Sequence, residues 1–250
     1  MATKVTGLGD NFYAGGYDLS GATNSLGKIS GSCNPLDVTD ITQSAHARLP
    51  GLRDGTIEFV TYLDISAGNS AHALLSQLQT TDVICSYFRG TTLGNPAASL
   101  NAKQIDYAPT RASDGSLSLA VQMLGDGNGL EWGSMLTAGK RTDTSATAGS
   151  FFDNGAAFAF GAQAYLQAFS FSGTDVTVKI QHATTSGGSY SDLITFSQIT
   201  GSTPLAQRAT VSNVTTVNEF LKVTTVTTGG FSSLVFAVMI NVNQVAGVVF

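Results

Sequence analysis

Apolar and polar residues alternate along much of the chain. In residues 116–123 every second side chain is apolar, so the apolar side chains share one face of a strand. Residues 56–63 and 175–181 repeat this period of two. Further apolar or alternating runs predict strands at residues 83–88, 165–171, 193–196, 209–211, 220–226 and 234–242.

One segment has a helical period instead. Apolar side chains at positions 71, 74, 75 and 78 recur at the spacing that places them on one face of an α-helix. Asn69 or Ser70 would cap its first turn. The pattern predicts one short helix near residues 70–79.

Turn sequences separate the predicted strands. Asp114-Gly115 and the segment 153–155 (Asp-Asn-Gly) are turn signals, and Gly229-Gly230 predicts a hairpin between the last two strands. Short strands divided by Gly, Ser and Thr turns are typical of an antiparallel sandwich or a jelly roll.

Composition supports this interpretation. Of the 250 residues, 30 are Thr, 26 are Ser and 28 are Gly, whereas only 12% are charged. β-Branched and small turn residues favour strands over helical bundles, and a hydrophobic share of 42% argues against disorder. We therefore expect an all-β fold: an antiparallel β-sandwich or half-barrel with one short flanking helix, plus a second β-sandwich or jelly-roll domain.

A domain boundary is predicted where residues 140–150 become small and polar without apolar periodicity. The expected units are residues 1–142, a linker at 143–150, and residues 151–250. The formal net charge is −4 for the first 150 residues and −1 for the last 100.

Several classes of partner are disfavoured. The net charge of −5 comes without a basic patch, which argues against a protein that reads DNA or RNA. The longest strongly apolar run is residues 234–240, far below the roughly 20 residues of a membrane-spanning helix, and the start of the chain lacks the apolar region of a secretory signal. Cys33 and Cys85 are interpreted as two reduced thiols.

The chain presents no catalytic, cofactor-binding or metal-binding motif. Its three histidines lack metal-ligand spacing, and no nucleophile elbow is present. Asp37, Asp40 and Asp54 form the densest acidic group, yet their neighbours favour turn chemistry over a hydrolase pair. The glycine-rich segment 125–131 has too few carboxylates for a calcium loop and is interpreted as a turn. We predict no enzyme, no cofactor and no metal.

Two stretches carry a family resemblance. The sequences LDVTD at residues 36–40 and LPGLRDGTIEF at 49–59 precede the predicted helix, two strands and the glycine turn. This order resembles the major tail protein, or tail tube protein, of long-tailed bacteriophages. Residues 164–181 and 220–224 are similar to the β-sandwich decoration domain appended to many such proteins.

The resemblance implies rings, commonly hexameric, that stack into a hollow tail tube through which DNA passes without specific binding. The loop at residues 33–51 would contact the adjacent ring and would be mobile in the monomer, and an N-terminal arm at residues 1–12 would contribute. The residues expected at these contacts are Leu36, Asp37, Val38, Asp40, Arg48, Leu49, Pro50, Arg53 and Asp54.

Further partners follow from the same resemblance. They are the tail tip, tail completion and tape measure proteins, together with weak glycan contact by the C-terminal domain. The protein would be made in the host bacterial cytoplasm and would reside in the virion tail. Acidic side chains of the first half are candidates for the lumen surface, with a solvated outer face as the default for each of them.

Other functions remain open at this point. The second half is also compatible with a carbohydrate-binding module that stacks sugars on aromatic faces, and a capsid decoration or adhesion protein is a further structural alternative. The candidate aromatic residues are Tyr165, Phe169, Phe171, Tyr190 and Phe220. A hydrolase would require acidic residues, such as Asp37 and Asp54, to be brought together by folding.

Overall fold

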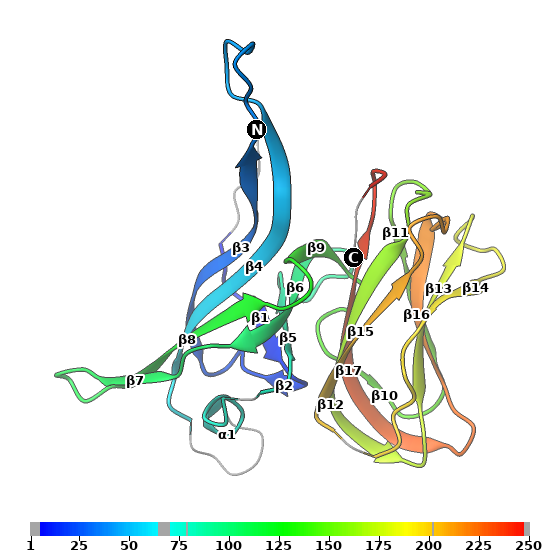
Figure 1. Ribbon diagram of the computed structural model, residues 1–250. Helices are drawn as coiled ribbons and strands as arrows, with labels where there is room; N and C mark the ends of the chain where they lie inside the picture. Colours follow the sequence, from blue (N-terminus) through cyan, green and yellow to red (C-terminus); the bar gives the residue numbers. More distant parts are fainter. Residues whose placement is uncertain (1–5, 65–70, 79, 202, 248–250) are drawn as a thin grey trace.

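The computed structural model describes residues 6–64, 71–78, 80–201 and 203–247, and within them the fold is nearly all β (Figure 1). The one helix of this described part is α1 (Ala71–Leu75). The predicted all-β class is therefore confirmed. The strands are β1 (Asn11–Ala14), β2 (Tyr17–Asp18), β3 (Thr23–Asp37), β4 (Arg48–Tyr62), β5 (Val83–Phe88), β6 (Pro96–Gln104), β7 (Ala108–Arg111), β8 (Leu117–Gly125), β9 (Glu131–Met135), β10 (Arg141–Asp143), β11 (Ala148–Asp153), β12 (Ala162–Gly173), β13 (Thr177–Ala183), β14 (Ser191–Thr195), β15 (Leu205–Val211), β16 (Phe220–Val226) and β17 (Phe231–Val242).

The antiparallel pair β4–β8 lies at the centre of the N-terminal half. Phe59 faces Val121 and Ile57 faces Met123 across the ladder. These four side chains and Leu119 are almost completely buried, as the alternating pattern predicts. They pack against β1, β5, β6 and α1 in one hydrophobic cluster.

The C-terminal half is a β-sandwich of two facing layers (Figure 1). One layer is the sheet β11-β16-β13-β14, and the other contains β15-β12-β17. Val178 and Ile180 of β13 meet Phe236 and Val238 of β17 in the core between them. Alternating apolar positions thus supply both inner faces, as in other sandwiches.

The hairpin predicted at Gly229-Gly230 is wrong. β16 pairs with β11 and β13, whereas β17 pairs with β12, β9 and β10, so the chain crosses between sheets at this point. The carboxylate of Asp175 holds the crossing by accepting hydrogen bonds from the backbone amides of Thr228 (2.8 Å) and Gly229 (2.6 Å). A Gly-Gly turn is compatible with either connection, so local sequence did not distinguish them.

One sheet continues from the first half into the second. β17 pairs with β9, placing Met239 opposite Met135. Beside this ladder, the Tyr13 ring packs edge-on against Phe88 and Phe169, with ring centroids 5.3 and 4.9 Å apart. These residues belong to a hydrophobic cluster shared by both halves.

A buried amide reinforces the junction. Gln167 of β12 accepts a hydrogen bond from the backbone of Gly16 (2.7 Å) and donates to the Ile84 carbonyl (2.9 Å) and the Ser86 hydroxyl (3.0 Å). Residues 144–147 of the predicted linker connect β10 to β11. The division into 1–142, 143–150 and 151–250 stays a prediction.

The segment predicted as an irregular loop at residues 33–51 is paired strand at both ends, over residues 33–37 and 48–51. β3 and β4 remain paired, with three register shifts, out to Asp37 opposite Arg48, so the connecting turn spans residues 38–47. Pro35 lies opposite Pro50, where neither residue has an amide hydrogen to donate. The Pro- and Gly-rich sequence predicted a loop, but two facing prolines occupy a position that needs no hydrogen bond.

In the N-terminal half the structure differs from two further expectations. Residues 11 and 12 of the expected arm begin β1, where Phe12 is buried, and residues 1–5 lie outside the described structure. The predicted helix at 70–79 is shortened to α1, and Leu78 is exposed with a positive φ of 42° instead of buried. The proposed caps, Asn69 and Ser70, lie outside the described residues.

Candidate functional site

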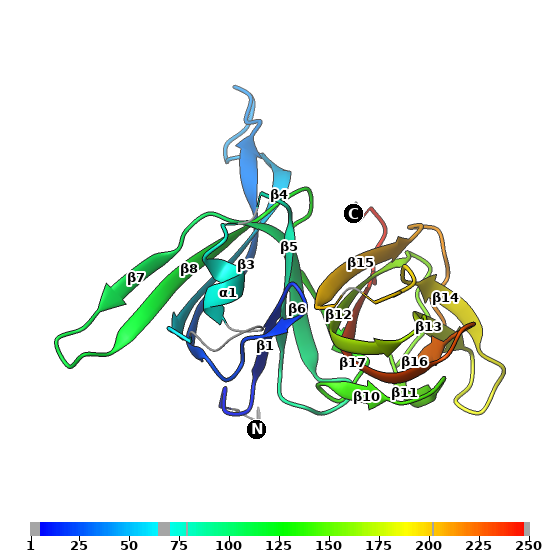
Figure 2. The ribbon, with the colours of Figure 1, turned by 90° about the horizontal axis from the view of Figure 1, so that it is seen from below.

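A long two-stranded hairpin projects from the N-terminal half (Figures 1 and 2). Its base is anchored, because residues 55, 57, 59 and 61 of β4 are buried against the core. Beyond Gly55, toward the tip, residues 48–54 of β4 are almost all exposed, and so is β3 from Gly31 onward. Gly55 marks the exit from the body, since a Cβ atom there would lie 2.4 Å from the Leu100 side chain.

The hairpin brings together the residues predicted to contact neighbouring subunits. Leu36 lies opposite Leu49, and Asp37 lies opposite Arg48. Pro50, Arg53 and Asp54 continue along β4, while Val38 and Asp40 lie in the connecting turn. Their role in subunit contact stays a prediction.

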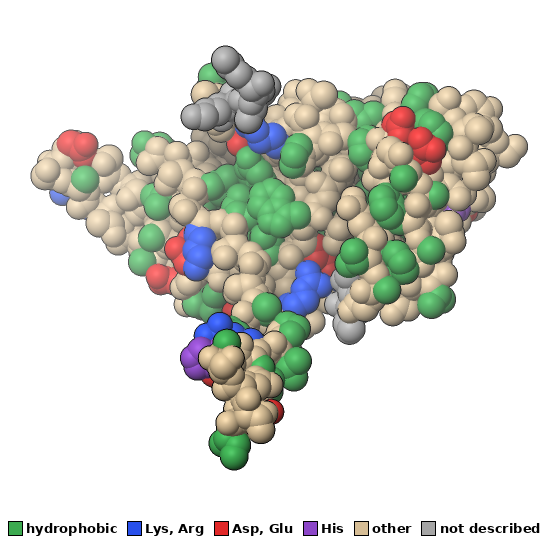
Figure 3. Space-filling model, turned by 90° about the horizontal axis from the view of Figure 1, so that it is seen from above, with side chains coloured by type: hydrophobic (Ala, Val, Ile, Leu, Met, Phe, Trp, Pro, Cys, Tyr) green, Lys and Arg blue, Asp and Glu red, His purple; other side chains and the backbone are tan. Residues whose placement is uncertain are grey.

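Large apolar side chains are exposed along this projection. Ile41 at the tip is fully exposed and Leu52 is 89% exposed, while Leu36 and Leu49 are each 54% exposed. Figure 3 shows hydrophobic side chains on the projecting part of the molecule. A concentration of exposed apolar groups is the usual mark of a surface that binds another protein.

The acidic residues of the tip act as turn-forming groups. Asp37 accepts hydrogen bonds from the Thr39 hydroxyl and amide (2.5 and 3.0 Å), which hold the pKa of its carboxyl below the usual value, and it also contacts His46 Nδ1 (3.0 Å). Asp40 binds the Thr42 hydroxyl and amide in the same way. These bonds organise the loop locally, in agreement with the predicted turn chemistry.

A second extension is formed by β7, the turn that follows it and the start of β8 (Figures 1 and 2). Within the described part of the chain β7 pairs with β8 alone, and most of its residues are exposed. The turn is held by Asp114, whose carboxylate accepts the Ser116 amide hydrogen at 2.9 Å. Sequence analysis identified this turn but did not predict that its strands would leave the body.

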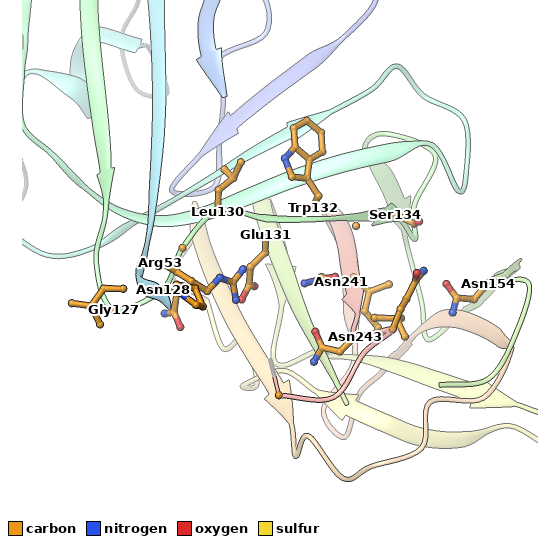
Figure 4. Close-up of a pocket in the computed structure, with 18 of the residues that line it drawn as sticks. Arg53, Gly127, Asn128, Leu130, Glu131, Trp132, Ser134, Asn154, Asn241 and Asn243 are labelled. Atoms are coloured by element: carbon orange, nitrogen blue, oxygen red, sulfur yellow. The ribbon is translucent and has the colours of Figure 1, made fainter. Parts of the chain in front are cut away.

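A groove of about 1070 Å³ lies at the junction of the two halves (Figure 4). It is bounded by the hairpin base, the start of β9 and the end of β17. At its edge the buried Glu131 accepts hydrogen bonds from the Tyr165 hydroxyl (2.6 Å) and from Arg208 (3.0 Å). Burial and the Glu131 carboxylate raise the pKa of Tyr165, so its hydroxyl remains a donor at neutral pH. No sequence pattern indicated this groove, because the residues that line it are distant along the chain.

The aromatic residues of the predicted sugar-binding face do not form one surface. Tyr165 is 1% exposed and Phe169 is 9% exposed, so neither ring can stack on a ligand. Phe171 and Phe220 are partly buried. The Tyr190 ring is covered by Lys222, whose Nζ lies 3.8 Å from the ring centroid.

The described residues were also compared with what a metal site, a membrane-spanning helix or a reactive thiol requires. The described residues contain no cluster of three His, Cys, Asp or Glu side chains able to hold a metal. No helix in this part of the chain is long and apolar enough to cross a membrane. Cys85 is buried, which raises the pKa of its thiol to about 12, whereas Cys33 is exposed on the hairpin.

No family model and no curated protein sequence matches this chain. Several solved structures are similar to it, and two are described here. One is the Dit protein of phage SPP1, described as a paradigm of the hub adsorption apparatus in phages that infect Gram-positive bacteria. Its sequence is 13% identical, the match covers 91% of this chain and 98% of that chain, and the TM-score is 0.35. The other is from the baseplate of phage P2 in its activated conformation with Ca, at 10% identity, 94% and 99% coverage, and a TM-score of 0.27. These structural neighbours are phage tail and baseplate proteins, at low identity and low TM-score.

Proposed function

We propose that this protein is a non-enzymatic structural component of a bacteriophage tail. Its copies assemble through the β3–β4 hairpin into rings, and the rings stack into the tube through which DNA passes. The hairpin is the observation that carries the proposal. The resemblance of residues 36–40 and 49–59 to tail tube proteins supplies the phage context.

The hairpin is poorly stabilised within a single copy. An isolated two-stranded ribbon is marginal in water, because each strand has one neighbour and no covered face. Here the outer part of the ribbon also exposes Leu36, Leu49 and Leu52 to solvent. Burying each such side chain against a second copy would contribute about 1.5–3 kcal/mol at most. Assembly would therefore bury apolar side chains of the hairpin that remain exposed in the monomer.

Free strand edges support the same conclusion. Among the residues that the structure describes, β3 pairs with β4 alone and β7 pairs with β8 alone. Unpaired edges of this length are hazards in a monomer, whereas a neighbouring copy can cover them. A contact between unlike surfaces of successive copies closes into a ring when the rotation between them permits.

The charge distribution suits a passage for DNA. The chain has a net charge of −5, and a lumen without a basic surface would not retain phosphate groups. Several acidic residues of the first half lie within 4.0 Å of a Lys or Arg side chain, which reduces their charge toward a lumen. They are Asp10, Asp18, Glu58, Asp82, Asp126, Glu131 and Asp143.

Such a component would bind the tail tip, tail completion and tape measure proteins at the ends and interior of the tube. It would be found in the virion. The C-terminal sandwich would lie outside the ring as a decoration domain.

Negative-stain electron microscopy of the purified protein over a concentration series tests the proposal. We expect rings or hollow tubes of constant width. Leu49→Asp should abolish them, whereas Leu78→Asp, at an equally exposed leucine next to α1, should not. Single rings that never stack would contradict the tube, and persistent monomers at all concentrations with and without tail tip proteins would contradict assembly.

A further inference from the structure

His182 occupies an inward-facing position in the C-terminal sandwich. In the β13–β16 ladder it lies opposite Leu221, just as Ile180 lies opposite Val223. Side chains that lie opposite each other across a ladder share one face of the sheet. Ile180, Leu221 and Val223 are buried in the core, so His182 continues the inner row of β13 near its end. A polar ring in this position needs a hydrogen-bond partner.

The partner is the backbone amide of Asn218. This amide donates a hydrogen bond to His182 Nδ1 over 3.1 Å. Because an amide N–H can only donate, Nδ1 must present its lone pair, and the ring hydrogen is then on Nε2. A protonated ring carries a hydrogen on both nitrogens and would meet the amide donor to donor. The contact is therefore available to the neutral ring alone.

The contact holds a segment that lies between two strands. Residues 212–219 connect β15 to β16 and belong to neither. Val217 exchanges two backbone hydrogen bonds with Phe158 (2.7 and 2.9 Å), and the Thr215 carbonyl accepts one from Gly161 (3.0 Å). Val217 is fully buried, so release of this segment would expose apolar surface at the end of the sandwich. A connecting segment can open while the strands stay folded, and the loss of one bond shifts that equilibrium.

No ion pair within the described residues stabilises the protonated form of His182. Lys179 and Asp192 of β13 and β14 bind each other (2.6 Å). In the facing layer β15-β12-β17 the charged residue is Arg208, which binds Glu131 (3.0 Å). The other ionisable groups of the neighbouring elements are Asp153, Tyr190, Glu219 and Lys222.

The surroundings keep the ring neutral. Burial lowers the pKa of the His182 imidazole below its usual value, because the charged ring loses hydration. The Asn218 contact acts in the same direction, since protonation abolishes it. A histidine held neutral in the closed segment stabilises it fully above the pKa of the released ring, about 6.5, and progressively loses this effect as pH falls below that value.

We propose that His182 is a pH-sensitive latch. Its neutral ring holds residues 212–219 against the end of the sandwich, and its protonation in mild acid releases them and uncovers Val217. The latch does not depend on the β3–β4 hairpin or on assembly, because all of its parts belong to the C-terminal half.

Hydrogen–deuterium exchange of the full-length protein, measured by mass spectrometry from pH 7.5 to 5.5, tests the latch. The protein would be kept at a concentration at which sedimentation gives one assembly state over this range. After correction for the intrinsic pH dependence of exchange, we expect the opening equilibrium of residues 212–219 to rise by up to about tenfold, the limit for one proton over the pH unit below 6.5. Peptides from β5, in the other half, should show no such rise and serve as the internal reference.

Two variants separate the titration of His182 from other effects of pH. His182→Asn replaces Nδ1 by an amide oxygen, which accepts a hydrogen bond at the same position and does not titrate. Exchange from residues 212–219 should then no longer depend on pH after the same correction. His46→Asn removes an exposed histidine of the hairpin tip and should keep the wild-type response.

Nitrogen-15 NMR of the wild-type imidazole gives a reading that needs no variant. We expect the Nε2–H tautomer of His182 at pH 7.5. A ring that carries its hydrogen on Nδ1, or that is already protonated at this pH, would overturn the proposal. So would an opening equilibrium that changes by less than about twofold between pH 7.5 and 5.5, or one that rises equally in His182→Asn.

Discussion

Arg208 of β15 donates a hydrogen bond to Glu131 of β9 over 3.0 Å, joining the two halves of the molecule. Arg208 Nε also donates to the Tyr165 hydroxyl (3.0 Å), which in turn donates to Glu131 Oε2 (2.6 Å). The Glu131 side chain is 1% exposed, so these two partners satisfy a carboxylate that solvent hardly reaches. The triad therefore fixes the orientation of the C-terminal sandwich relative to β9.

Removing Arg208 should destabilise the protein strongly. Arg208→Met leaves the buried Glu131 carboxylate without its cation, and such a loss costs about 3–5 kcal/mol for a fully buried pair. Because Arg208 is partly solvated, we expect about 2–3 kcal/mol, measured as the free energy of unfolding in urea.

The double variant Glu131→Gln/Arg208→Met provides the control. Since it removes the charge together with its partner, it should be more stable than Arg208→Met alone. Strictly additive losses would contradict an interaction between the two side chains.

Two glycines near the groove should respond differently to alanine. A methyl group at Gly133 would collide with the backbone of Ile240, so Gly133→Ala should cost about 3 kcal/mol or more and separate β9 from β17. Gly127 has a φ of +72° but open space around it, so Gly127→Ala should cost only about 1 kcal/mol. The urea midpoints of the two variants would be compared. Equal losses of stability would refute the role of the close contact between Gly133 and Ile240.

The sequence predicted the core strands well, because period-two alternation records burial directly. Ile57, Phe59 and Leu119 occupy the interior positions that their spacing indicates. The prediction from sequence was wrong where one local sequence is compatible with two different strand connections. The turn at Gly229-Gly230 serves a crossing between sheets as well as it would serve a hairpin, and the choice depends on distant strand pairing.

The candidate site was predictable only in part. Residues 36–40 and 49–59 were recognised from a motif, yet the strand pairing of residues 33–37 with 48–53 was hidden by Pro35, Pro50 and Gly51. Gly51 appears flexible in sequence, whereas in the structure a Cβ atom there would lie 2.3 Å from the Asn34 carbonyl oxygen. The groove was missed because Trp132, Asn154 and Asn241 have no shared sequence pattern.

Acid should weaken the corner between β16 and β17 through Asp175. Hydrogen bonds from the Thr228 amide and hydroxyl, the Gly229 amide and Thr227 lower the pKa of the Asp175 carboxyl below its usual value. A lowered folded-state pKa stabilises the protein above the unfolded-state value of about 3.9 and loses this effect as pH falls through the folded-state pKa.

Urea midpoints between pH 6 and pH 2.5 would measure this contribution. Asp175→Asn should be less stable than the wild type at pH 6, and the difference should shrink as the pH falls. Thr228→Val removes one donor and should raise the pKa of Asp175 toward its usual value. A constant difference between wild type and Asp175→Asn across this range would contradict the assignment.

The tip of the hairpin should govern assembly without affecting the monomer. Ile41 is fully exposed, so Ile41→Ser removes no contact within one copy and should leave the free energy of unfolding unchanged. If the tip is buried between copies, losing the apolar side chain should raise the concentration needed for assembly at least tenfold, since about 1.4 kcal/mol corresponds to a factor of ten. Val214→Ser, at an 81% exposed residue of the C-terminal half, is the matched control. Sedimentation over a concentration series would separate the two, and equal behaviour of both variants would place the subunit contact elsewhere on the molecule.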